Sequence, residues 1–127
     1  MNPFIQEGDK ITIIQELMYY PGDILVFVYK SKNILVHRLL KRENNIYFCK
    51  GDNSFRLEDI KENQIIGKVI RINGSSVIPC SDELINLSYL VNREYRKCKY
   101  SREDTQMSAV YIQYKKYIES LYDMHVN

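Results

Sequence analysis

The chain has 127 residues, of which 45% are hydrophobic and 27% are charged, a balance typical of one globular domain with its own core. Its formal net charge of +2 gives no general case for nucleic acid, so we expect no nucleic-acid partner. No apolar run approaches the roughly 18 residues that a transmembrane helix needs, and the first residues lack the charged and apolar regions of a secretory signal.

The first two-thirds of the chain predict a β-rich body. Short apolar or β-branched runs of strand length lie at 10–14, 24–29, 34–40, 46–49 and 65–72. Pro21-Gly22-Asp23 and Asn73-Gly74 are turn signals between them. Residues 50–63 are polar and show no convincing period, so we expect a structured loop there. Gly67 stands inside a predicted strand and indicates a bulge or a close approach of another segment.

The last third changes to helical spacing. Ser81 is a good N-cap, followed by two acidic residues and then by apolar residues near one helix face. Ser101 opens a similar pattern that continues almost to the end of the chain. The sequence therefore predicts a mainly β fold with two C-terminal α-helices. We expect a β core over residues 1–80 and a helical extension over 81–127, packed on the same domain.

The cysteines give no sign of a disulfide framework or of a metal site. Cys49, Cys80 and Cys98 are an odd number and show no metal-ligand spacing. Reduced thiols in a cytosolic setting fit this pattern best. We expect no metal, and we assign no cofactor.

Three segments carry the pattern that points to chemistry. The segments are Met1-Asn2-Pro3 with Gly8-Asp9, then Pro21-Gly22-Asp23-Ile24 with Val36-His37-Arg38, and then Lys50-Gly51-Asp52-Asn53 with Asp59 and Ile65-Ile66-Gly67-Lys68. In this order the set resembles the type I signal peptidase family, over about residues 1–72. The resemblance implies the β-fold that this family shares with LexA-like repressors, and the activity of a serine endopeptidase. The Val36-His37-Arg38 context is similar to the branch whose base is histidine, whereas the housekeeping enzymes and the LexA-like repressors use lysine.

The resemblance also implies roles for individual residues. It makes His37 the general base, because a neutral imidazole can take a proton from a serine hydroxyl and return it. Asp52 and Asp59 are the candidates for a carboxylate that orients the ring. Met1 and Pro3 stand at the motif that the family places beside its substrate.

The nucleophile that the family requires lies outside the sequence. In the family, the nucleophilic serine immediately precedes the methionine of the Met-x-Pro motif, which is Met1 here. An upstream start that supplies this serine is the explanation we favour, because His37 and its surroundings are kept. A pseudo-peptidase that keeps the fold without the chemistry is the alternative. Ser54 is the serine nearest the Gly-Asp-Asn loop, but the resemblance puts it at a position that is not nucleophilic. We expect the 127-residue form to be inactive or nearly so.

The leading hypothesis is therefore a signal peptidase-like serine endopeptidase that cleaves precursor peptides, cytoplasmic or peripherally attached to a membrane. A non-catalytic peptide-binding module is the second hypothesis, and a repressor-type dimerisation domain is the third. The basic residues between 93 and 102 fit a solvated helix end, and they could also contact an anionic membrane surface. The sequence leaves the oligomeric state open.

Overall fold

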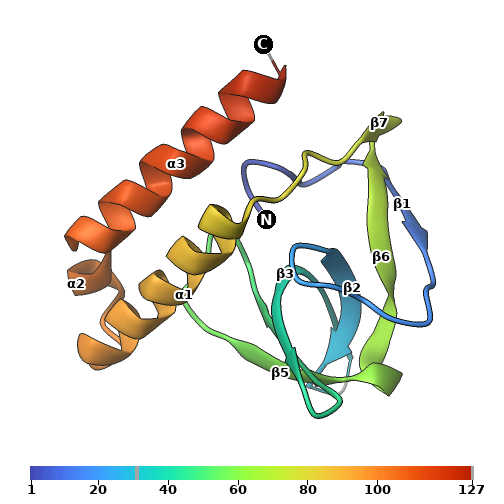
Figure 1. The fold of residues 1–127 in the computed structure, drawn as a ribbon, viewed down its shortest axis with the longest axis horizontal. Helices are drawn as coiled ribbons and strands as arrows, with labels where there is room; N and C mark the ends of the chain where they lie inside the picture. The colour runs from blue at the N-terminus through green and yellow to red at the C-terminus, as the bar shows by residue number, and fades with distance from the viewer. Residues whose placement is uncertain (31, 127) are drawn as a thin grey trace.

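The structure, a computed structural model, describes residues 1–30 and 32–126 and consists of an antiparallel sheet followed by helices (Figure 1). The strands are β1 (Ile11–Ile14), β2 (Ile24–Tyr29), β3 (Asn33–Glu43), β4 (Ile46–Lys50), β5 (Glu58–Lys61), β6 (Ile65–Ile72) and β7 (Ser75–Ser76). The helices are α1 (Asp82–Lys97), α2 (Arg102–Gln106) and α3 (Ala109–Val126), and a 3₁₀ turn, η1, covers Glu62–Gln64. The predicted mainly β fold with C-terminal helices is confirmed.

The strands form one sheet in the order β1-β6-β2-β3-β4-β5, and β7 pairs with β6. All the pairings are antiparallel. The sheet curls, and α1 lies between it and α3, with the N-terminus close to the start of α1 (Figure 1). This order places β2 and β3 in the middle of the sheet and makes β5 an edge strand next to β4.

The strands follow the sequence prediction except in residues 50–63 and in the two-residue strand β7. The predicted runs at 24–29 and 65–72 coincide with β2 and β6. A Cβ atom on Gly67 would lie 2.7 Å from the backbone oxygen of Ile14, so the predicted close approach is confirmed. The prediction of a loop over residues 50–63 is wrong in part, because this segment contains β5 and η1.

The helices begin at the serines that the sequence singled out, but the second predicted helix is divided. The Ser81 hydroxyl accepts a hydrogen bond from the Leu84 backbone N–H at 3.1 Å, as an N-cap does. Ser101 caps α2 in the same way, yet α2 ends after five residues. The Ser108 hydroxyl then accepts from the Tyr111 backbone N–H at 3.1 Å, which gives α3 a start of its own.

The helices share a core with the loop between β4 and β5. This core consists of Phe4, Phe55, Leu84, Leu87, Val91, Tyr95, Tyr114 and Ile118. Phe55 comes from the loop, and its carbonyl accepts a hydrogen bond from the buried Asn92 side chain of α1 at 2.8 Å. A separate cluster under β2 to β5 contains Phe27 and Leu39. The helical segment therefore fixes the loop that follows β4.

Candidate active site

His37 and Glu58 form a close pair at one face of the sheet. Nδ1 of His37 lies 2.5 Å from Oε1 of Glu58. Because a carboxylate accepts hydrogen bonds, this contact places the proton of the neutral imidazole on Nδ1 and leaves Nε2 able to accept another. The ring packs edge-to-face on Phe27, with centroids 6.0 Å apart, and the side chain of His37 remains 18% exposed. The pair therefore has the geometry of an oriented base that solvent and ligands can reach.

Gly51 is required where the imidazole passes the loop after β4. A Cβ atom at this position would lie 2.8 Å from Nε2 of His37 and 3.0 Å from the hydroxyl of Ser54. Any side chain would thus push one of these groups away. Glycine at position 51 allows the loop backbone to approach Nε2 of the ring.

Ser54 lines the same hollow as the pair. The hollow has a volume of about 280 Å³, and His37, Ser54 and Glu58 are among its lining residues. The Ser54 hydroxyl donates a hydrogen bond to the Gly51 carbonyl at 3.2 Å. Ser54, which the resemblance makes non-nucleophilic, is therefore close to the imidazole, but its hydroxyl is hydrogen-bonded to the backbone.

Asp52 forms an ion pair with Arg38, the residue that follows His37 on β3. Successive residues of a strand point to opposite faces, so Arg38 leaves the face of the imidazole. Its guanidinium donates to both carboxylate oxygens of Asp52, at 2.8 Å and 3.0 Å for the two shortest contacts, and to the Gly22 carbonyl at 3.0 Å. Burial alone would lower the pKa of Arg38, but Asp52 outweighs burial and raises this pKa above its ordinary value. Asp52 thus connects the Gly-Asp-Asn loop to Arg38, and it does not orient His37.

Asp59 is exposed, and it follows Glu58 on β5. Since strand residues alternate, the side chain beside Glu58 cannot share its direction. The expectation that Asp52 or Asp59 orients the ring therefore differs from the structure, in which Glu58 makes that contact. No signal in the sequence distinguishes Glu58 from Asp59, because two adjacent acidic residues in a polar segment look alike.

Met1 and Pro3 lie on the other side of the Gly51-Asp52 loop. The sulfur of Met1 accepts a hydrogen bond from the Asp52 backbone N–H at 3.5 Å. Met1 packs against the cluster of Ile24, Val26 and Val69, whereas the imidazole packs on Phe27, so the two approach the loop from different faces of β2. They meet at neighbouring residues, since His37 borders Gly51 and Met1 contacts Asp52.

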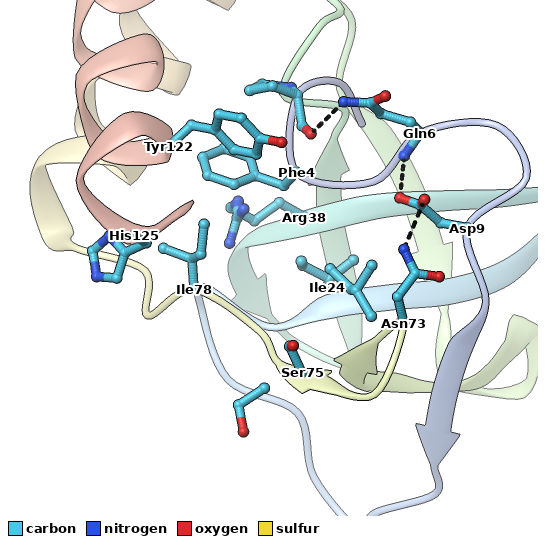
Figure 2. Close-up of a pocket in the computed structure, with 13 residues that line it drawn as sticks. Phe4, Gln6, Asp9, Ile24, Arg38, Asn73, Ser75, Ile78, Tyr122 and His125 are labelled. Carbon is cyan, nitrogen blue, oxygen red and sulfur yellow. Dashed lines mark hydrogen bonds between the residues drawn. The ribbon is translucent and has the colours of Figure 1, made fainter. Parts of the chain in front are cut away.

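Pro3 borders a larger cavity of about 520 Å³ (Figure 2). In the close-up the rings of Phe4 and Tyr122 lie near Arg38, which also lines the cavity. Phe4 and Tyr122 contact each other edge-to-face with centroids 6.0 Å apart. The motif around Pro3 is therefore joined to the end of α3 and separated from the hollow of His37.

Lys50 is a buried residue of the site that the sequence did not reveal. Its ammonium group donates to the carbonyls of Gly51 and Ser54, at 2.9 Å and 2.8 Å, and to the hydroxyl of Tyr114 at 3.2 Å. The Tyr114 hydroxyl in turn donates to the Asp52 carbonyl at 2.9 Å. Burial lowers the pKa of Lys50 to about 8, against the opposing effect of Asp52 and Glu58. This network fastens α3 to the loop beside the imidazole.

Over residues 1–30 and 32–126, no group of three or more His, Cys, Asp and Glu side chains is placed to hold a metal ion. In the same residues, no helix combines the length and apolar character needed to cross a membrane. The three cysteines are thiols, and Cys49 is buried.

Comparison of the chain with protein-family models, with curated proteins and with solved structures finds no match.

Proposed function

We propose that this chain is the core of a signal peptidase-like serine endopeptidase in which His37 is the general base. Its substrates are precursor peptides, met in the cytoplasm or at a membrane surface. The observation that carries the proposal is the 2.5 Å contact between His37 and Glu58, in a histidine that lines a small hollow.

The pair supplies what acyl transfer requires of a base. A serine hydroxyl is a weak nucleophile until a neighbour takes its proton during attack. Nε2 of His37 would accept that proton as the serine oxygen bonds to the peptide carbonyl carbon. It would then donate the proton to the leaving amine, and a water molecule would release the acyl group by the reverse sequence. Glu58 would hold the ring in the required tautomer and stabilise the imidazolium that forms at each stage.

The serine itself comes from the family resemblance, which puts it directly before Met1. Met1 contacts Asp52, and Asp52 follows the glycine that borders Nε2. A residue before Met1 would therefore start close to the loop that the imidazole touches. This proximity supports a nucleophile delivered by the N-terminal segment.

The test compares two extended chains that are identical except for serine or alanine directly before Met1. Both are incubated with a library of short peptides, and cleavage is followed by mass spectrometry. We expect the serine form to cleave peptides and the alanine form to be inactive. Substitution His37→Ala in the serine form should lower the rate by about 100-fold or more, as the loss of a general base does.

His37→Ala should leave the fold intact, which circular dichroism checks, because the side chain is partly exposed. Equal cleavage by the serine and alanine forms would refute the proposed nucleophile. Equal cleavage with and without His37 would refute the base.

The second candidate is a peptide-binding module without catalysis. The hydroxyl of Ser54 favours it, because this serine lies in the hollow of His37 and is bonded to a backbone carbonyl. On this alternative the serine and alanine forms bind the same peptides equally and cleave none of them.

A further inference from the structure

A second hollow continues from the one that holds His37. Its volume is about 590 Å³, and it shares Arg56 and Tyr95 with the smaller hollow. Arg96 and Tyr100 line the larger hollow, and Arg102 lines the smaller one. We name these five residues the arginine groove. A ligand that reaches the imidazole can therefore extend over the C-terminal end of α1.

The groove carries an excess of positive charge. Arg56, Arg96 and Arg102 are exposed, and none of them takes part in the ion pairs found among residues 1–30 and 32–126. The carboxylate of Asp59 also lines the larger hollow, while that of Glu58 is engaged by His37. Three guanidinium groups thus face the groove against one carboxylate that His37 does not hold. This imbalance fits an anionic ligand.

Aromatic rings pack together beside the groove, and one of the arginines lies over them. Phe55 and Tyr95 are stacked with centroids 5.3 Å apart, and Tyr100 contacts Tyr95 at the same separation. The guanidinium carbon of Arg102 lies 5.1 Å from the centre of the Phe55 ring. A guanidinium that rests on an aromatic ring keeps its in-plane N–H donors for a carboxylate. The Phe55 ring therefore restricts Arg102 without consuming its capacity to bind an acidic group.

We infer that the arginine groove binds an acidic segment of the peptide on which His37 acts, so that aspartate or glutamate near the cleaved bond selects the substrate. The identification of this ligand as a substrate rests on the proposed function. An anionic membrane is the other class of partner that basic residues could serve. The groove favours a peptide because its arginines line hollows next to the imidazole, and because Arg56 comes from the loop before β5 and not from the basic stretch of α1.

The test measures binding by the 127-residue chain and needs no cleavage. The probe is a short fluorescent peptide of alternating glutamate and alanine, and the matched probe carries glutamine in place of glutamate. Fluorescence anisotropy should show that the glutamate peptide binds and that the glutamine peptide binds at least about tenfold more weakly. Each of Arg56→Gln, Arg96→Gln and Arg102→Gln should weaken the glutamate peptide by about fivefold.

Arg93→Gln is the matched control, because Arg93 is exposed on the same helix as Arg96 and lines neither hollow. It should change the affinity by less than about twofold. If Arg93→Gln and Arg96→Gln weakened the affinity for the glutamate peptide equally, binding would reflect general charge attraction, and the inference would be overturned. Equal binding of the two peptides would overturn it as well. Binding of phosphatidylserine vesicles that depends on the three arginines, without binding of the glutamate peptide, would assign the surface to a membrane instead.

The same assay separates this inference from the proposed function. His37→Ala should lower cleavage by the serine-extended form about 100-fold or more, whereas the three arginine variants should weaken binding of the glutamate peptide. Binding of the glutamate peptide with no cleavage by any form would refute the peptidase function and support the acidic-ligand site. Cleavage without any preference for acidic peptides would refute the acidic-ligand site and support the peptidase function.

Discussion

His37 and Arg38 are consecutive residues of β3, and each one pairs with a carboxylate on a different face of the sheet. The Arg38–Asp52 pair is sealed, with side chains 3% and 0% exposed. The His37–Glu58 pair is more open, with side chains 18% and 10% exposed. Because a sealed ion pair cannot exchange protons with a ligand, the first pair serves the fold. The second is open enough for a ligand to reach it.

The sealed pair also explains why the motif segments occur together. Arg38 contacts the Gly22 carbonyl, the Asp52 carboxylate and, through its guanidinium carbon at 5.5 Å from the centroid, the ring of Phe4. One buried side chain thus joins the three segments on which the family resemblance rests. Part of that resemblance therefore reflects the construction of the site and not its chemistry.

The largest expected effect is on the sealed pair. Arg38→Ala leaves the Asp52 charge buried without its partner, so the free energy of unfolding should fall by about 3–5 kcal/mol, measured with urea. The double variant Arg38→Met with Asp52→Leu should recover much of this loss, because it leaves no buried charge. A loss below about 1 kcal/mol for Arg38→Ala would contradict the structural role of the pair.

A smaller effect is expected where the loop approaches the open pair. Gly51→Ala would bring a methyl group within 2.8 Å of Nε2 of His37, and overpacking of this kind costs about 1–3 kcal/mol. The same change should displace the ring and reduce cleavage by the serine-extended chain. Asn53→Ala, at an exposed position of the same loop, is the control and should affect neither property. Full activity in Gly51→Ala would show that the ring does not need this loop.

Neutralising the two carboxylates separately should affect the stability of the chain to different extents. Glu58→Gln should reduce the free energy of unfolding by about 1.5 kcal/mol, since the pair it weakens is partly exposed. Asp52→Asn should cost clearly more, because Arg38 would keep its charge in a buried place. Urea unfolding of both variants measures the difference. Equal losses would mean that the two faces do not differ in the way described.

The last effect concerns Lys50 and pH, and it is the smallest one per pH unit. Burial lowers its pKa in the folded chain to about 8, whereas an unfolded lysine has a pKa of about 10.4. Between these values the unfolded chain binds more protons, so this lysine makes the folded state more stable as pH rises, by at most about 1.4 kcal/mol per pH unit. The free energy of unfolding of the unchanged chain should therefore rise from pH 8 to 10 relative to that of the Lys50→Met variant, which lacks this titrating group. A fall over this range would show that Lys50 does not lose its proton as described.

The sequence predicts the regular parts of this molecule well. The apolar runs locate β2 and β6 at their observed ends, and Ser81 marks the start of α1. The division of the second helix escapes prediction, because Ser108 within a helical pattern does not reveal whether its hydroxyl caps a new helix. Local spacing thus determines most elements, but not every boundary between them.

The missed strand and the missed site residue have one physical cause. β5 contains the polar residue Glu58 at a buried position and has Ile60 as its one apolar residue, so it shows no recognisable alternation. Glu58 is buried because it contacts His37 on β3, with β4 lying between their strands in the sheet. This contact depends on tertiary structure and cannot be read from local sequence. The sequence identifies His37 through the motif around it, whereas its carboxylate partner requires the fold.

The tautomer of His37 can be read from ¹⁵N nuclear magnetic resonance of the imidazole at alkaline pH, and it decides whether Glu58 orients the ring as a base. We predict a proton on Nδ1, held by Glu58, and no proton on Nε2. Glu58→Gln should weaken this preference. A proton on Nε2 with Nδ1 bare would contradict the account, because the nitrogen beside Gly51 could then accept nothing.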